Sequence, residues 1–457
     1  MRGWLLSAAL LAAAAAIGLA RPHPTPGPPM RDFEAYYAAG TVWDAGGDAY
    51  SQAIWRAERK LPGVRASRYE ALPFVGPPAL LPIFGAIAKL PFAAANVLWR
   101  ALLVAAIAAL ALLTLRFARI RISPVSFIAI ALAAIGFGPL TSALALGQLA
   151  LPAMLFAALA TISPAAGVLA WIQPNVGFAV TAQKRAWVGA AAFAAICAAV
   201  AGAPGVLHYI GVVHRHSLGE RFSAIQITPA SIAYGFGLAP AQANAAGAIV
   251  ALAAICCWFL LMRAKSGAAA RFCGTCALLP LAMPFFHEHD LIVLFVPAVI
   301  YAARCADRLW PLAASGALLA GTDWLGLAQR PGALLQTVLL VAALSCALIA
   351  LRDRPQARML IVPALGLALI AIAGALARAH PAPVWPDAMH ALPQNLASLD
   401  LASAWSAQQQ AAGLFAIQPV WALLRALSLA GCALTAAAAA LSSKSPADSR
   451  SPSPAPA

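Results

Sequence analysis

The sequence predicts an all-α polytopic membrane protein, and three observations indicate this fold class. Hydrophobic residues occupy 62% of the 457 positions and charged residues only 10%, whereas a soluble globular domain carries roughly 25% charge. Apolar runs of membrane-spanning length, roughly 17 to 25 residues, recur along the chain. The sequence also lacks the ten-residue polar and apolar alternation of barrel strands, so helices are expected to satisfy the backbone in lipid.

The apolar runs predict a bundle of about 12 membrane helices, between roughly 10 and 14. Runs of spanning length are found at 4–20, 96–115, 123–143, 186–203, 241–262, 333–351, 359–377 and 413–441. Shorter runs, or runs interrupted by Pro and Gly, lie at 76–94, 147–182, 273–303 and 310–328. We therefore expect one membrane-embedded domain over residues 1–441, and a disordered, Ser- and Pro-rich cytoplasmic tail at 442–457.

The first apolar run has two interpretations. It begins with Arg2 and ends in small residues, as a cleaved signal peptide does. We favour a retained first helix, because it tethers the loop that follows and completes the topology.

The positive charge of the chain indicates membrane orientation and excludes nucleic acid as a partner. The formal net charge is +15, but Lys and Arg occur in ones and twos at the ends of apolar runs, which is the pattern that orients membrane helices. The clusters expected in the cytoplasm are Lys184/Arg185, Arg263/Lys265/Arg271, Arg304/Arg308, Arg352/Arg354/Arg358 and Lys444. The loops at 21–73, 204–235, 285–291 and 378–412 then lie outside. The side of Arg116–Arg121 stays open, because it depends on whether 76–94 spans.

The cysteines indicate no disulfide framework. All eight lie within apolar segments or at their ends, and none falls in the large outer loops. Cys273 and Cys276 have CxxC spacing but no second pair, which favours a buried packing role over metal or redox chemistry.

The acidic residues point to the first outer loop. Six of the fifteen fall within residues 31–70, and none lies between 71 and 219. Asp32 and Glu34 differ from the others, which we interpret as solvated loop residues. They lie about a dozen residues beyond the first apolar run and precede Tyr36 and Tyr37, whose rings favour the boundary between water and lipid. Later in the loop, Arg56 is a candidate for pairing with a phosphate or with lipid headgroups.

A second polar group occurs in "MPFFHEHDLIVLFVP", where His287, Glu288, His289 and Asp290 follow one another. Three interpretations remain: phosphate and sugar contacts by the histidines, a divalent metal site, and solvation of a helix end. We expect no metal, because consecutive residues should not all converge on one ion. Two amides also interrupt apolar runs, Gln148 and Gln173, and such residues mark helix packing or a broken helix beside a cavity.

These features favour a transferase at the outer face of the membrane. No glycine-rich phosphate loop is present, and nucleotide sugars are not supplied outside the cell, so the donor is expected to be a sugar on a polyprenyl phosphate. In this hypothesis Asp32 takes the proton of the acceptor hydroxyl, and Glu34 orients the acceptor or an ion. Arg56, His287 and His289 are candidates for stabilising the departing phosphate. Asp290, Gln148 and Gln173 are further candidates for binding the phosphate or the sugar of the donor.

Five segments resemble glycosyltransferase family 87, formerly uncharacterised family 2029, of the GT-C superfamily. They are "RDFEAYYAAGTVWDAGGDAYSQAIW", "LPFVGPPALLPIFGAIAKLPFAAANVLW", "GQLALPAMLF", "AGVLAWIQPNVGF" and "MPFFHEHDLIVLFVP". The similarity runs from about residue 30 to 300, and the first segment is the most specific.

The resemblance implies an inverting enzyme of the bacterial inner membrane that uses a polyprenyl-phosphate sugar, often mannose, and a glycolipid or polysaccharide acceptor. It assigns the base to Asp32, with Glu34 completing a D-x-E motif. The chain has Gln173 and Pro174 where many members have Lys-Pro, which removes a cation. Members often show Tyr-Asp or His-His around "FHEHD", so the match falls on His289 or Asp290.

Two other function classes compete with a transferase. A transporter or lipid flippase is expected to carry polar groups at mid-membrane depth and internal symmetry, and the apolar runs contain almost no acidic residue and no repeat. The second class is a non-catalytic assembly subunit, and the acidic first loop argues mildly against it, because such a subunit does not require one.

Overall fold

The computed structural model describes residues 30–61, 72–183, 185–264, 267–324, 326, 332–351, 357–380 and 399–442. Within these ranges the regular elements are α-helices and short 3-10 helices, with one isolated β-bridge between Gln226 and His287. The all-α prediction is therefore confirmed. The first apolar run at 4–20 and the predicted tail beyond Ser442 lie outside the described residues.

Four described helices are long and apolar enough to cross a membrane. They are α5 (Phe92–Phe117), α11 (Ala186–Glu220), α13 (Pro240–Arg263) and α21 (Pro419–Ser442). A fifth span results if α6 (Pro124–Gly136) and α7 (Gly138–Leu146), which are bent by 69° at their junction, are counted as one. These helices support a membrane protein, and the predicted count of about 12 spans is not confirmed.

The other apolar runs are divided into shorter helices. The remaining elements are α2 (Arg31–Asp44), α3 (Ala53–Glu58), η1 (Pro78–Leu80), α4 (Leu81–Ile87), α8 (Ala150–Leu159), η2 (Pro164–Ala166), α9 (Gly167–Ala170), α10 (Pro174–Gly177), η3 (Phe178–Ala182), α12 (Pro229–Gly235), α14 (Ala268–Ala282), η4 (Glu288–Leu294), α15 (Phe295–Arg304), η5 (Asp307–Leu309), α16 (Trp310–Gly321), α18 (Gly332–Leu351), α19 (Ala357–Ala379) and α20 (Leu401–Ala411). The breaks fall where the backbone cannot continue a helix. For example, Gly147 ends α7 in the left-handed region at φ 79°, and Pro174 begins α10 at its first position.

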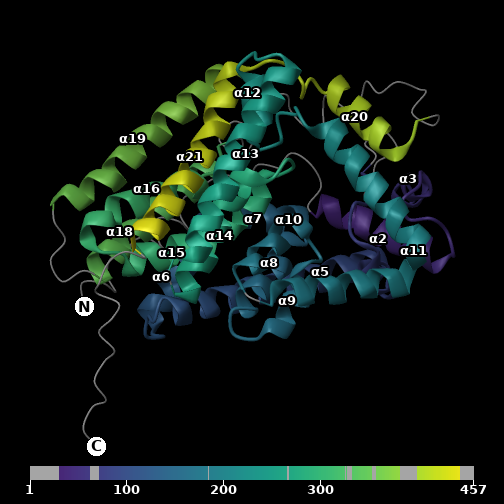
Figure 1. Cartoon of the computed structure of the whole chain (residues 1–457), viewed down its shortest axis with the longest axis horizontal. Helices are drawn as coiled ribbons and strands as arrows, with labels where there is room; N and C mark the ends of the chain where they lie inside the picture. The colour runs from purple at the N-terminus through teal and green to yellow at the C-terminus, as the bar shows by residue number, and fades with distance from the viewer. Residues whose placement is uncertain are drawn as a thin grey trace, which may run out of the picture.

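The longer helices form two groups, and several short elements lie between them. Figure 1 shows α16, α18, α19 and α21 at one end of the molecule, where they pack on one another, and α2, α3, α11 and α20 at the other. The short elements α7, α8, α10 and η4 are in mutual contact between these groups. Residues Leu291–Leu294 of η4 are almost completely buried in this central region.

The predicted outer loops contain more helix than the sequence indicated. The segment 21–73 contributes α2 and α3, and 378–412 contributes α20. The run predicted to end at 203 continues as α11 to Glu220, so much of the predicted loop 204–235 is helical. The helix survives Pro204 because the backbone kinks at Gly202, whose φ of 67° only glycine adopts easily.

The structure also shows which end of the molecule holds the Arg116–Arg121 cluster. The guanidinium group of Arg304, at the end of α15, donates a hydrogen bond to the backbone carbonyl of Ala118 and another, at 2.6 Å, to that of Arg119. Residues Arg116–Arg121 therefore lie at the same end as Arg304. A mostly apolar cavity of about 750 Å³ opens beside them and includes Arg119, Arg121 and Arg304 in its lining.

Candidate functional site

The site combines the two polar stretches that the sequence singled out, although they lie more than two hundred positions apart. Asp32 occupies the first turn of α2, and His287 precedes η4. The amides Gln148 and Gln173 lie between them, at the start of α8 and at the start of α10. The contacts form two groups. In the first group, Gln148 contacts Asp32 and Tyr36. In the second group, Asp290 contacts two side-chain amides and the histidines.

The N-terminus of α2 is fixed against the end of α7. The backbone N–H of Met30 donates to the carbonyl of Ala145 at 2.7 Å. Met30 itself adopts a left-handed backbone, φ 66°, which costs energy in a non-glycine residue. A Cβ at Gly147 would lie 3.0 Å from the Cβ of Phe33, so a glycine here lets the two helices approach closely. This packing determines where Asp32 lies.

Gln148 connects Asp32 to Tyr36. The side-chain amide of Gln148 donates a short hydrogen bond to Oδ2 of Asp32, and its carbonyl oxygen accepts from the Tyr36 hydroxyl at 3.0 Å. Asp32 and Tyr36 are four residues apart and so share one face of α2. Burial raises the pKa of Tyr36 well above its usual value, and the charge of Asp32 raises it further. The phenol therefore stays protonated, which fixes the amide orientation that supplies an N–H to Asp32.

Asp290 is fully buried and held by three donors. Gln173 Nε2 donates to its Oδ1 at 3.3 Å, and Asn175 Nδ2 donates to its Oδ2 at 3.2 Å. The backbone N–H of His287 also donates to Oδ2, at 3.1 Å. These three donors fix the orientation of the carboxylate, and Oδ1, which accepts one of the three, keeps a second lone pair for a further contact.

His287 is held by a second buried carboxylate, Glu220 at the end of α11. Nε2 of His287 lies 3.1 Å from Oε1 of Glu220, and Nε2 of His216 lies 3.1 Å from the other oxygen, Oε2. Gln409 of α20 donates to Oε1 at 2.9 Å. Gln226 accepts from the N–H of Phe286 at 2.9 Å, and its amide nitrogen lies 3.0 Å from Nε2 of His287. The predicted late outer loop thus contributes to the site through α20.

The two histidines of the site lie together but differ in electrostatics. Their rings stack with centroids 5.1 Å apart. Burial alone would lower the pKa of His287, but Glu220, Asp290 and Asp32 outweigh it, and the pKa is raised. Burial dominates at His289 and lowers its pKa, although Asp290 opposes this. Near neutral pH, His287 is therefore the more readily protonated of the two, and His289 the more readily neutral.

Asp32 belongs to the same electrostatic environment as these histidines. Its charge acts on both His287 and His289, and the charge of Asp290 acts on Tyr36. Asp32 is partly exposed, whereas Asp290 is not. The site thus presents one accessible carboxylate beside a buried cluster of imidazoles and a carboxylate.

Three predicted residues lie elsewhere. Glu34 is buried and two positions from Asp32, so the 100° turn per residue places it on roughly the opposite face of α2. Tyr37 is buried in protein, where its hydroxyl donates to the carbonyls of Ala88 at 3.2 Å and Leu90 at 2.8 Å. Arg56 is exposed on α3, and within the described part of the chain no hydrogen bond or ion pair joins it to the site.

The tyrosine pair was expected at the membrane interface, and the structure gives both rings protein contacts. Tyr36 is 6% exposed and Tyr37 is 8% exposed. Each hydroxyl finds its partner inside the protein, because a buried O–H without one is costly. The contacts of Tyr36 belong to the site, and those of Tyr37 to the packing of α2 on α4 and the residues that follow it.

Sequence reasoning missed three residues that complete the site: Glu220, Gln226 and Gln409. One signal could have found Glu220, because it is the first carboxylate after the acid-free stretch 71–219. Asn175 follows two residues after Gln173 and was visible in the same motif. Nothing in the local sequence distinguishes Gln226 or Gln409.

The cluster also places metal-ligand atoms together. One ligand atom from each of His287, His289 and Asp290 lies within 4.8 Å of the others. Glu288 is not in this group, so three of the four consecutive residues approach one another and the expectation of no metal stays a prediction.

No family model, curated protein or solved structure matches this chain. The resemblance to glycosyltransferase family 87 therefore stays a prediction.

Proposed function

We propose that this protein is an inverting glycosyltransferase that moves a sugar from a polyprenyl-phosphate donor to an acceptor hydroxyl of a glycolipid or polysaccharide. The observation that supports it most is that Asp32 lies close enough to His287 and His289 for its charge to act on both. A single displacement at a sugar carbon needs a base for the attacking hydroxyl and a separate group for the departing phosphate. This site offers both, from two distant parts of the chain.

Asp32 acts as the base in this proposal. Gln148 holds Oδ2, so Oδ1 is the oxygen that accepts the proton of the acceptor hydroxyl. As the acceptor oxygen bonds to the anomeric carbon, the bond from that carbon to the phosphate oxygen breaks, and its electron pair leaves with the polyprenyl phosphate. General-base assistance of this kind contributes roughly 10² to 10⁴ in rate.

The histidine cluster binds the phosphate end of the donor. The imidazole of His287, held by Glu220, can carry positive charge where negative charge develops on the leaving phosphate. This supplies a cation near Gln173, at which the chain lacks the lysine of many members of the family it resembles. Arg56, on the exposed surface of α3, is not part of this assignment.

We place the site at the outer face of a bacterial inner membrane. The segment from η4 to the end of α15 joins the site to Arg304, although it is not among the described helices that are long and apolar enough to cross a membrane. The site lies at its beginning and Arg304 at its end. An excess of arginine favours the cytoplasmic side for that end.

The proposal is tested by replacing Asp32 with Asn in membranes supplied with a radiolabelled polyprenyl-phosphate sugar and a lipid extract as acceptor source. Asp44→Asn is a matched control, because Asp44 is on the same helix but pairs with Lys89 at the surface, at 3.3 Å. We expect transfer to fall by at least about 100-fold in Asp32→Asn and to persist in Asp44→Asn. Unchanged transfer in a folded Asp32→Asn protein would refute the assignment.

A further inference from the structure

We propose that His287, His289 and Asp290 bind a divalent transition-metal ion, with Glu220, Asn175 and Gln173 as the surrounding residues that orient the ligands. The binding site follows from the geometry of the described side chains. The role that we give to the ion rests on the proposed function.

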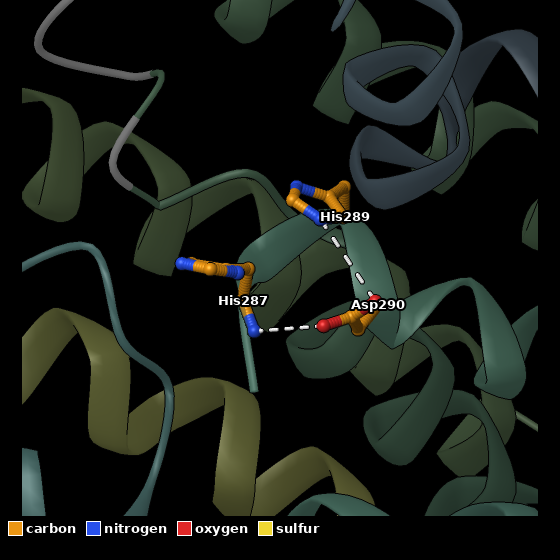
Figure 2. Close-up of side chains that lie close together, drawn as sticks. All are labelled: His287, His289 and Asp290. Atoms are coloured by element: carbon orange, nitrogen blue, oxygen red, sulfur yellow. Dashed lines mark hydrogen bonds and ion pairs between the residues drawn. The ribbon is translucent and has the colours of Figure 1, made fainter. Parts of the chain in front are cut away.

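The three side chains approach one another as ligands of one ion do. Figure 2 shows the side chains of His287, His289 and Asp290 close together at the start of η4, where Asp290 contacts the backbone nitrogen of His287 and the ring of His289. Nε2 of His289 lies 3.8 Å from Oδ1 of Asp290. This separation is too long for a hydrogen bond, yet both atoms can lie about 2.1 Å from a single ion between them. Tetrahedral ligands of one ion lie roughly 3.4 Å apart, so at the widest separation in the group, within 4.8 Å, the side chains must close by up to about 1.4 Å.

Glu220 gives His287 the arrangement that is usual for a metal ligand. A ligating histidine almost always donates its second ring N–H to a carboxylate or carbonyl, which fixes the tautomer. Nε2 of His287 lies 3.1 Å from Oε1 of Glu220. The amide nitrogen of Gln226 lies 3.0 Å from the same Nε2 and cannot accept its proton. Because the carboxylate is the acceptor of the two, we assign the proton of this nitrogen to the bond with Glu220. Nδ1 is then the nitrogen that can bind the ion.

Asp290 is supported in the same way. Its oxygens accept hydrogen bonds from Gln173 and Asn175, and a carboxylate oxygen has a second lone pair for an ion. These amides orient the carboxylate without adding charge. Glu220, Asp290 and Asp32 together surround the two imidazoles with negative charge, which favours a cation between them.

The ligand types select the kind of ion. Two imidazoles and one carboxylate suit Zn²⁺, Mn²⁺ or another first-row divalent ion, whereas Mg²⁺ and Ca²⁺ prefer oxygen ligands alone. Three protein ligands leave coordination positions open for substrate, as in catalytic metal sites. When bound, the ion would hold His287 as a neutral ligand and would supply, in place of a protonated His287, the positive charge that neutralises the phosphate of the donor.

Metal uptake by the purified full-length protein tests the proposal directly. The protein in detergent is stripped with EDTA, reloaded with ZnCl₂ or MnCl₂, and analysed by inductively coupled plasma mass spectrometry and isothermal titration calorimetry. We expect uptake of one ion per chain that His289→Asn and Asp290→Asn remove. His214→Asn is the matched control, because His214 is exposed on α11 and outside the cluster. It should retain the full uptake.

Glu220→Gln tests the supporting residue separately. We expect it to weaken metal affinity by about 10- to 100-fold without changing the number of ions bound, as removal of such partners generally does. Thermal unfolding and gel filtration in detergent show whether each variant is folded. Mg²⁺ at the same concentration should not compete for the site.

Three results would overturn the proposal: no Zn²⁺ or Mn²⁺ uptake by the stripped wild type, unchanged uptake in a folded His289→Asn protein, or an equal loss in His214→Asn. The readout is independent of catalysis. Metal binding without sugar transfer would therefore support the site and refute the proposed function. Sugar transfer that depends on Asp32, in a protein that takes up no Zn²⁺ or Mn²⁺, would support the proposed function and refute the metal site.

Discussion

The two ends of the segment from η4 to α15 differ in whether their charged side chains are buried and paired or exposed. At the beginning of η4, carboxylates and imidazoles are buried and nearly every one has a partner from another helix. Asp290 accepts from α10 and its N-terminus, and Glu220 contacts His287, His216 and Gln409. At the end of α15, Arg304 is exposed and donates to the backbone carbonyls of Ala118 and Arg119, which follow α5, beside an apolar cavity.

This difference indicates that the buried network serves the chemistry of the site, whereas the exposed arginines serve membrane orientation. Burying a charge is expensive unless it is paired, so a chain retains a network of buried charges only where their geometry matters. Exposed arginines at helix ends cost little and are explained by their effect on membrane orientation. We therefore expect substitutions in the η4 network to affect stability and transfer strongly, and substitutions at the arginine end to affect both weakly.

The largest effect is expected from Glu220→Ala. It removes the carboxylate that two imidazoles and one amide share, and breaking a buried ionic group in this way costs about 3 to 5 kcal/mol. The loss should appear as a large fall in the unfolding temperature in detergent. Glu220→Gln, which keeps the volume and one acceptor, should unfold at an intermediate temperature. Equal unfolding temperatures for wild type and Glu220→Ala would contradict the role of the network.

A smaller effect is expected from Gln148→Leu. This substitution keeps the volume but removes the donor to Asp32, and a hydrogen bond to a charged group contributes about 1.5 to 3 kcal/mol. We expect kcat/KM for sugar transfer to fall by about 10- to 150-fold, with less change in thermal stability. Wild-type kinetics in this variant would show that Asp32 does not depend on the amide.

Asp400→Ala should have a modest effect, because Asp400 caps α20, which carries Gln409. Its Oδ1 accepts from the backbone N–H groups of Ala402 and Ser403, and loss of a cap costs about 0.5 to 2 kcal/mol. The Ser403 hydroxyl, with these N–H groups, lowers the pKa of Asp400. The stabilisation is thus complete above the ordinary carboxyl pKa and disappears as pH falls through the lowered value. A thermal stability difference that grew on acidification would contradict this.

Arg121→Gln should have the smallest effect. Arg121 is exposed beside the apolar cavity, and surface substitutions of this kind usually change stability by less than about 0.5 kcal/mol. Transfer in membranes should stay within about twofold of wild type. A loss comparable to that of Gln148→Leu would remove the distinction between the two ends.

The sequence predicted the fold class and the main polar residues because composition and local pattern carry that information. Asp32, Gln148, Gln173, His287, His289 and Asp290 were all identifiable as polar interruptions in an apolar chain. Their convergence in one site could not be predicted. It depends on the close approach of α2 to Gly147 and on the way the backbone of η4 orients its side chains. Glu220 and Gln409 belong to helices that begin or continue where loops were predicted, so no local pattern connected them to His287. The count of about 12 spans is not confirmed, because Pro and Gly divide several of the described apolar runs into pieces shorter than a span.

The central claim is that Asp32 and the histidine cluster form one site, and a double-mutant cycle on kcat/KM tests it most directly. The cycle compares wild type, Asp32→Asn, His289→Asn and the double variant in the labelled transfer assay, with folding verified by thermal unfolding. Residues that act in one site are strongly non-additive. We predict that kcat/KM of the double variant is only slightly lower than that of the less active single variant. Losses that multiply, as for independent and distant residues, would contradict the account.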